Sequence, residues 1–264
     1  MPNYITNQLS FGTDKAAVAA FQRMAEEMRV EGEFLGTFDF NKLLPMPAEL
    51  NITAGTKTER GLELYRQFIQ ESEATSLQGQ ALSESEQEEL ASEHLEKWTK
   101  LQGQDPEMWS LGEKAYQNIQ KYGSPTWYEW CNKNWGTKWN AGHCVQMGPD
   151  SDTMQFLTAW GGVPNLIKLL SAKYPDQKIS YRWADEDIGT NVGERVFQGG
   201  EEIEANIPPA LSREAYELAA EIMGLNLADY DLYLTEDKSG YQYLPDGPKA
   251  TKDHQKEKKG RSER

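Results

Sequence analysis

The sequence predicts an α+β fold in which helices pack on one face of a mostly antiparallel sheet. Two strand–helix–strand patterns support this class, one over residues 4–40 and one over residues 152–184. The second pattern is the clearer one: DTMQFLTAW and KISYRWA alternate as strands do, and VPNLIKLLSAKY between them has helical periodicity. Because such crossovers are nearly always right-handed, each unit has essentially one way to wind.

The first unit begins with a strand at Tyr4–Phe11, where apolar and polar side chains alternate. Asp14 is placed to cap the helix that follows. The apolar face of this helix has spacings of four, three and four, and consists of Ala17, Phe21, Met24 and Met28. Phe34–Phe40 is predicted as the second strand, because its three phenylalanines share one parity.

Residues 58–123 are predicted to form an acidic helical insertion between the two units. Residues 83–86 have the Ser-x-x-Glu spacing of a capping box, the Asp-Pro pair at 105–106 opens a further helix, and Gly123 suits its end. Residues 71–107 contain ten acidic and two basic side chains. We therefore expect a solvated acidic layer here.

A tryptophan-rich crossing segment, SPTWYEWCNKNWGTKWNAGHC, precedes the second unit. Its pattern predicts a short helix from Pro125 to about Lys133, a turn at Gly136 and then an extended piece. Beyond the second unit, Glu194–Phe197 and Glu201–Ile207 flank a Gln-Gly-Gly turn and predict a hairpin. Ser212 then caps a last helix that closes at Gly224, and short strand-like pieces follow near residues 230–234 and 241–244.

Two strand–helix–strand units in one sheet predict a ferredoxin-like βαββαβ sandwich, with a helical insertion between its halves and a C-terminal hairpin-helix extension. The predicted boundaries are 1–57 and 124–207 for the discontinuous core, 58–123 for the insertion, 208–245 for the extension and 246–264 for a disordered basic tail.

Five segments together resemble the YubB-type ferredoxin-like family: MPNYITNQL, FDFNKLLPMP, WYEWCNKNWGTKWNA, TAWGGVPNLIKLLSAKYP and YRWADEDIGTNVGE. They cover most of residues 1–60 and 124–207. Two positions depart from the family pattern, Trp183 where a tyrosine is expected and Tyr4 where a tryptophan is expected. The family consists of small proteins of phages, plasmids and integrated elements, and much of it has no assigned activity. The resemblance therefore implies a fold and a mobile-element setting, but no catalytic residue.

The chain has 264 residues and a formal net charge of −15. The tail at 249–264 carries +4, so the rest carries −19. Such acidity repels phosphate backbones and makes direct nucleic-acid binding an unfavourable interpretation. It can attract basic protein surfaces, although acidity also serves solubility alone. The start lacks the pattern of a signal peptide, and no apolar run approaches the roughly 18 residues that span a bilayer. Two cysteines are too few for a disulfide framework. We therefore expect a cytoplasmic protein of the host cell without a membrane partner.

Asp185, Glu186 and Asp187 form a carboxylate triplet that could bind a divalent cation. Three consecutive side chains point in different directions, which favours a turn in which Asp side chains bond the loop backbone. Cys131 and the adjacent pair at 143–144 invite a zinc hypothesis, but they lack the close pair and the fourth ligand of a structural site. No catalytic residue, cofactor or metal ligand is predicted, and the phosphate-loop and hydrolase motifs are absent from the sequence.

The tryptophans of the crossing segment have two interpretations. They can stack on bases or on a nucleotide ring, or they can fasten the segment onto the sheet as large buried aromatics. We favour the structural interpretation. If a functional surface exists, we expect it on this segment together with the loop at Asp185–Glu194. The candidate binding residues are Trp127, Trp130, Trp135, Lys138, Trp139, Asp185, Glu186, Asp187 and Glu194.

The leading hypothesis is a non-enzymatic binding protein of a mobile genetic element. It would act by protein–protein contact and inhibit a host defence complex such as a CRISPR effector, and its partner would be a host protein or nucleoprotein complex with a basic surface. The alternative is a nucleotide or small-ligand binder, or a hydrolase, that uses the tryptophan segment and the acidic loop. A third hypothesis, single-stranded nucleic-acid binding through the sheet, is the least compatible with the charge.

Overall fold

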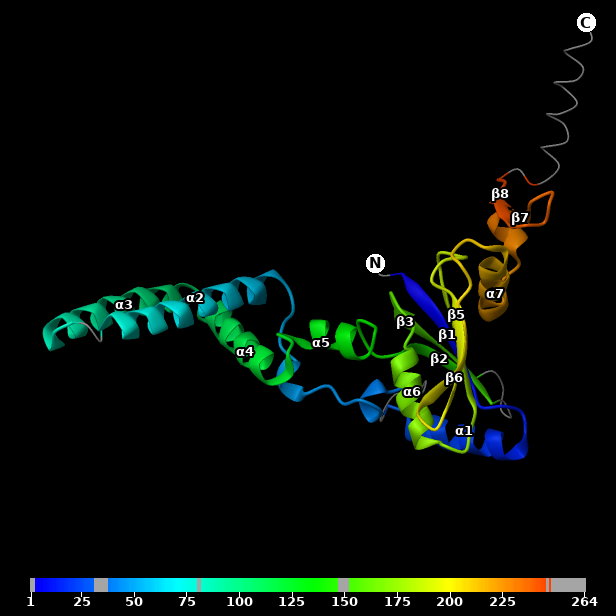
Figure 1. Cartoon of the computed structure of the whole chain (residues 1–264), viewed down its shortest axis with the longest axis horizontal. Helices are drawn as coiled ribbons and strands as arrows, with labels where there is room; N and C mark the ends of the chain where they lie inside the picture. Colours follow the sequence, from blue (N-terminus) through cyan, green and yellow to red (C-terminus); the bar gives the residue numbers. More distant parts are fainter. Residues whose placement is uncertain (1–2, 31–37, 80–81, 147–151, 246, 248–264) are drawn as a thin grey trace, which may run out of the picture. The chain divides into compact units, whose positions relative to one another are not determined.

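The computed structural model describes residues 3–30, 38–79, 82–146, 152–245 and 247 (Figure 1). It divides into two compact units, residues 1–44 with 135–264 and residues 45–134, which we call the sheet unit and the helical unit. The helical unit includes more residues on both sides than the predicted insertion at 58–123. One reason is Asn118, whose side chain donates to the carbonyls of Glu49 and Pro125, both at 3.0 Å, and so joins the flanking segments to the helices.

A six-stranded sheet with the order β2-β3-β1-β4-β5-β6 forms the sheet unit, and its neighbouring strands pair antiparallel. The strands are β1 (Tyr4–Ser10), β2 (Gly142–Gln146), β3 (Thr153–Ala159), β4 (Ile179–Asp185), β5 (Gly193–Gln198) and β6 (Glu201–Asn206). The central strand β1 lies between β3 and β4, which the helix α6 (Pro164–Lys173) connects. This split strand–helix–strand unit confirms the predicted α+β class with an antiparallel sheet.

The prediction that Phe34–Phe40 is the second strand of the sheet is wrong in the described part of that segment. Phe38 makes only an isolated bridge to Arg29, and Phe40–Lys42 form a 3-10 turn (η1). Residues 34–37 lie outside the described residues. Phe38 and Phe40 are buried against Phe156, with ring centroids 5.3 and 6.2 Å away, so their shared parity reflects packing and not a strand.

The strand beside β3 is β2 instead. In chain order the helical unit therefore lies between α1 (Lys15–Glu27) and β2. It interrupts the first strand–helix–strand unit, whereas the sequence led us to expect it between the two units.

One face of the sheet packs on α1 and α6. Asp14 caps α1 as predicted, accepting from the N–H groups of Ala16 and Ala17 at 2.8 and 3.0 Å. Phe11, which follows β1, contacts Phe21 of α1 and Tyr174 at the end of α6, with ring centroids 5.8 and 5.5 Å away. These aromatic side chains join both helices to the same face.

The opposite face is covered by α7 (Arg213–Met223), so helices pack on both faces and not on one as predicted. Ala184 and Val192 form a buried cluster with Ala215, Ala219 and other apolar residues of α7. Figure 1 shows α6 and α7 on opposite sides of the sheet. The predicted hairpin is confirmed as β5–β6, and it extends the main sheet. A separate pair, β7 (Leu232–Leu234) and β8 (Tyr241–Tyr243), follows the turn η3 (Leu227–Tyr230).

The helical unit contains α2 (Thr56–Gly79), α3 (Glu84–Gln104), α4 (Pro106–Tyr122), α5 (Trp127–Asn134) and the turn η2 (Ala48–Leu50). The predicted capping box at Ser83 and Glu86 is confirmed, and Gly123 ends α4 with a φ of 70°. A cluster of aromatic rings holds α2, α3 and α4 together, and it consists of Tyr65, Phe68, His94, Trp98, Trp109 and Tyr116. No helix among the described residues is long and apolar enough to span a bilayer.

Candidate functional site

The nine candidate residues are divided between the two units. Trp127 and Trp130 belong to α5 of the helical unit, and the other seven belong to the sheet unit. Trp130 is buried, and Trp127 is half-buried with its ring against Tyr128, 5.8 Å away. The burial of Trp130 and the contact of Trp127 with its neighbour in α5 are typical of packing residues.

Trp135 is also placed in a core. Its side chain is 4% exposed, its Nε1 donates to the carbonyl of Leu44 at 2.9 Å, and its ring meets Phe40 edge-on at 5.7 Å. Because both the polar and the apolar parts of the indole are used, this residue joins the loop that starts at residue 135 to residues 40–44 within the sheet unit.

The carboxylate of Asp185 is buried and closes the loop between β4 and β5. Its Oδ1 accepts from the Asn3 amide at 3.3 Å and from the N–H of Asp187 at 3.0 Å, and its Oδ2 accepts from the Asn191 amide at 3.2 Å. Asp187 instead bonds Thr190, and Glu186 is exposed. The three carboxylates thus point to different surroundings, and no group of three His, Cys, Asp or Glu side chains in the described ranges is arranged to hold a metal ion.

The two thiols are shielded. Burial raises the pKa of Cys131 and of Cys144 to about 11, and at Cys144 a hydrogen bond from the N–H of Phe38 offsets part of that effect. Both side chains are therefore protonated at neutral pH, and neither is an activated thiolate nucleophile.

Lys138 and Trp139 take part in a surface cluster that the sequence did not predict as a whole. The ammonium of Lys138 lies 4.8 Å from the ring centroid of Trp139 and 5.4 Å from that of Trp160, both cation–π distances. Trp160 is 43% exposed and has a φ of 67°. We call Lys138, Trp139, Trp160 and Asn191 the indole cluster.

Asn191 and Asn3 hold Trp160 in its left-handed conformation. The N–H of Trp160 donates to the carbonyl of Asn3 at 2.9 Å, and its carbonyl accepts from the Asn191 amide at 3.3 Å. Both asparagines also bond Asp185. One buried carboxylate therefore links the loop after β4 to the exposed tryptophan after β3.

The backbone beneath the cluster is closely packed. A Cβ at Gly161 would lie 2.7 Å from the carbonyl oxygen of Gly136, so the two loops touch through their main chains. Thr137 reinforces this contact, because its hydroxyl donates to the carbonyl of Ala159 at 3.0 Å and accepts from its N–H at 2.9 Å. The indole cluster therefore sits on loops with little freedom to move.

A buried polar network supports the same loop from the core side. The hydroxyl of Tyr181 donates to Oδ1 of Asn7 and accepts from the N–H of Val163, both at 2.6 Å. The Asn7 amide donates to the hydroxyl of Thr158 at 2.8 Å, and that hydroxyl donates to the carbonyl of Gly161 at 2.7 Å. Burial raises the pKa of Tyr181, so the phenol stays neutral and keeps its donor.

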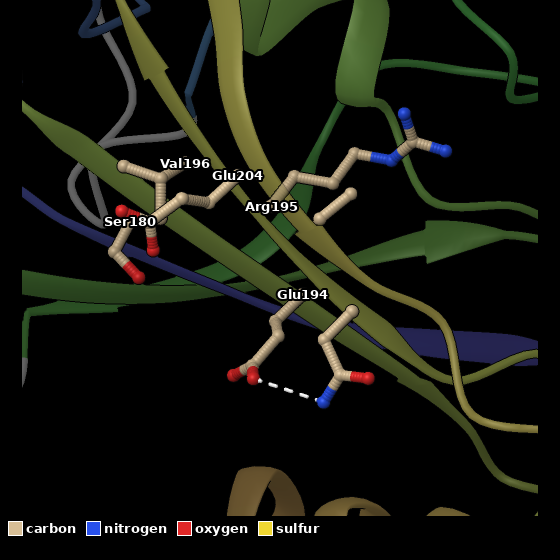
Figure 2. A pocket seen from close by; sticks show the side chains of 7 residues that line it. Ser180, Glu194, Arg195, Val196 and Glu204 are labelled. Atoms are coloured by element: carbon tan, nitrogen blue, oxygen red, sulfur yellow. Dashed lines mark hydrogen bonds between the residues drawn. The ribbon is translucent and has the colours of Figure 1, made fainter.

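Glu194 does not belong to this cluster. It lines a separate hollow of about 120 Å³ on the α7 side of the sheet, where its carboxylate accepts from Asn206 at 3.2 Å. Figure 2 shows Ser180, Glu194, Val196 and Glu204 along this hollow, with the Arg195 side chain directed away from it. A hollow of this size is smaller than the roughly 300–1,000 Å³ of ordinary ligand pockets.

Sequence reasoning missed Trp160 and Asn191. Only Asn191 had a local signal, since asparagine tolerates the left-handed region. Trp160 had none, because a tryptophan before two glycines does not indicate a positive φ. The sequence singled out the tryptophan segment and the loop at 185–194 as candidate regions. In the structure Lys138 of the first and Asn191 of the second each contact Trp160.

Residues 134–226 form a ferredoxin-like domain, since they match the family model described as the ferredoxin-like domain in Api92-like protein. A comparison with solved structures matches 80% of this chain to 99% of the crystal structure of the protein api92 from Yersinia pseudotuberculosis, with 11% sequence identity and a TM-score of 0.37. No curated protein matches the sequence. A ferredoxin-like domain is thus confirmed for residues 134–226. The exact βαββαβ arrangement with its insertion, the YubB-type resemblance and the mobile-element setting stay predictions.

Proposed function

We propose that this protein is a non-enzymatic binding protein of a mobile genetic element, which acts by protein–protein contact on a basic host surface. The observation that carries the proposal is the acidic face of α3. Six glutamates of this helix are exposed, namely Glu84, Glu86, Glu88, Glu89, Glu93 and Glu96, against two lysines. A high density of carboxylates on one helix steers association toward a basic partner and disfavours an acidic one.

Apolar side chains accompany those carboxylates. Leu77 near the end of α2 is 67% exposed, and Leu95 of α3 is 68% exposed. Glutamates alone would serve solubility, whereas an exposed leucine between Glu93 and Glu96 of the same helix supplies the apolar contact that a protein interface needs. The pairing supports a protein as the partner in preference to a small ion.

The concrete form of the proposal is inhibition of a host defence complex such as a CRISPR effector. The support is the sequence resemblance to proteins of phages and plasmids together with the acidity, since a carboxylate-rich surface can occupy a basic channel built for a nucleic-acid backbone.

The test is purification of the tagged full chain from a host that carries such a complex. We expect a nucleoprotein complex to co-purify and its target cleavage to fall. A variant with Glu88, Glu89, Glu93 and Glu96 changed to glutamine keeps the capping box and removes four charges, so it should lose the partner. A complex that co-purifies equally with this variant would contradict the role of α3, and the absence of any partner and of any inhibition would refute the proposal.

A small-ligand function is the alternative, and one hollow in the helical unit favours it. The hollow has a volume of about 490 Å³, which is within the range of ligand pockets. Its lining includes Lys114 and Tyr122, which can contact an anionic aromatic ligand, and Lys121, whose ammonium is paired with Glu49 at 2.9 Å. Thermal denaturation with millimolar nucleotides decides between the two functions, because a ligand that binds only the folded state must raise the melting temperature. An unchanged melting temperature would eliminate the alternative.

A further inference from the structure

We propose that the indole cluster is the docking site for an arginine side chain presented by a basic partner protein. The inference rests on the proposed protein-binding function and names the chemistry that this surface recognises. Its first support is that the cluster already holds a cation: the Lys138 ammonium lies over both indole rings, at 4.8 and 5.4 Å. The two rings are therefore arranged for a positive charge.

The second support is exposure combined with rigidity. The Trp160 side chain is 43% exposed, yet its backbone is fixed by Asn3 and Asn191 in a conformation that costs a non-glycine residue energy. A rigid, exposed tryptophan loses little conformational entropy on binding, which is why tryptophan is frequent among residues that dominate interfaces.

The third support is charge complementarity. Glu186 and Asp187 are exposed on the loop after β4. The N–H of Glu186 donates to the carbonyl of Tyr4, and the carbonyl of the preceding residue, Asn3, accepts from the N–H of Trp160. With a net charge of −15 on the chain, carboxylates and indole faces together favour a cation over a phosphate. A guanidinium suits this surface better than an ammonium, because it is planar, stacks on aromatic faces and is more weakly hydrated.

In this arrangement Lys138 is a competitor for the incoming arginine. The partner's guanidinium takes the place of the ammonium over Trp160, and the lysine side chain moves toward solvent. This exchange gives two variants opposite effects. Removing the Trp160 ring weakens binding, and removing the Lys138 ammonium strengthens it.

The experiment is a titration of the full-length protein with a hexaarginine peptide, followed by the indole N–H signals in nitrogen-15 NMR spectra and by calorimetry. The signals of Trp139 and Trp160, assigned with Trp→Phe variants, should shift. We expect W160A to weaken binding about tenfold, W160F to weaken it less, and K138A to tighten it several-fold. Hexalysine, of equal charge, should bind more weakly than hexaarginine.

Two controls separate the site from general attraction between opposite charges. K15A removes one exposed lysine from the start of α1, so it changes the net charge by the same amount as K138A. Y243A removes a 65% exposed aromatic from β8. The proposal requires K138A to tighten binding more than K15A does, and Y243A to leave it unchanged. Thermal denaturation of each variant verifies folding.

Equal effects of K138A and K15A, or unshifted indole signals, would overturn the proposal. Binding of an oligothymidine that K138A weakens would also overturn it, since that pattern belongs to a phosphate ligand. If hexaarginine fails while a host complex still co-purifies, only the assignment of this surface is lost. If both fail, the proposed function fails with it.

Discussion

Replacing Gly61 with alanine should destabilise the helical unit, because α2 and α4 cross with their main chains in direct contact. A Cβ at Gly61 would lie 2.1 Å from the carbonyl oxygen of Met108 and 3.0 Å from the nitrogen of Gly112. From the other helix, a Cβ at Gly112 would lie 2.1 Å from the carbonyl group of Gly61. Each atom that would be hit belongs to the backbone, so no side-chain rotation can relieve the overlap.

The magnitude follows from two opposing effects. Ordinary contact begins near 3.4 Å, so the helices would have to separate by about 1.3 Å at the crossing. Overpacking of this kind costs about 1–3 kcal/mol, and the backbone clash argues for the upper end. Alanine gains about 1 kcal/mol over glycine in helix propensity. The expected result is a net loss of about 2 kcal/mol in the free energy of unfolding.

The assay is urea denaturation followed by circular dichroism, with Gly103→Ala as the matched control. Gly103 is also helical, in α3, but a Cβ there would meet nothing within 4 Å. The control should therefore be neutral or up to about 1 kcal/mol more stable. If Gly61→Ala is as stable as Gly103→Ala, the close crossing of α2 and α4 does not exist and the reasoning is refuted.

Three further predictions concern the sheet unit. Trp160→Gly should be about 1 kcal/mol more stable than Trp160→Ala, because only glycine adopts a φ of 67° without strain; equal stabilities in thermal denaturation would contradict it. Tyr181→Phe should cost about 1–3 kcal/mol and speed amide exchange at Val163, whose N–H would lose its buried acceptor; unchanged exchange would count against the network. Burial raises the pKa of Asp152, but hydrogen bonds, chiefly from the Ser10 hydroxyl, outweigh it and leave the pKa lowered. The stability that this carboxylate contributes is thus present above about pH 4 and is lost as the pH falls through the folded pKa. Asp152→Asn should therefore weaken the dependence of the free energy of unfolding on pH at the acid side. An unchanged dependence would refute the role.

The helix ends were predictable because their chemistry is local. Asp14, the capping box at 83–86 and Gly224 each act on backbone groups within a few residues, and the structure has all three as predicted. The strands β1, β3 and β4 were predictable for a related reason. The alternation of apolar and polar side chains shows which of them face the core. A strand of seven residues is long enough for this alternation to be recognised in the sequence.

The second strand could not be assigned in the same way. β2 has five residues and a register shift between Gly142 and Val145, so it carries little alternation. The phenylalanines of residues 34–40 show a stronger alternation than β2 does. Phe38 and Phe40 are nevertheless buried at a turn and not in a paired strand. A short strand is defined by its pairing partner, and the pairing of β2 with β3 depends on the rest of the sheet.

By itself the sequence determined the α+β class, the acidic helical segment and the positions of most helices, because periodicity, caps and charge are properties of neighbouring residues. Only the tertiary structure decided that α7 covers the second face, and that the candidate tryptophans divide between two units. It also decided that Trp160 stands exposed in a left-handed conformation, next to a lysine from another loop. These features depend on contacts between residues distant in the chain. The buried carboxylate of Asp185 bonds Asn3 and Asn191, and Gly136 and Gly161 pack main chain against main chain.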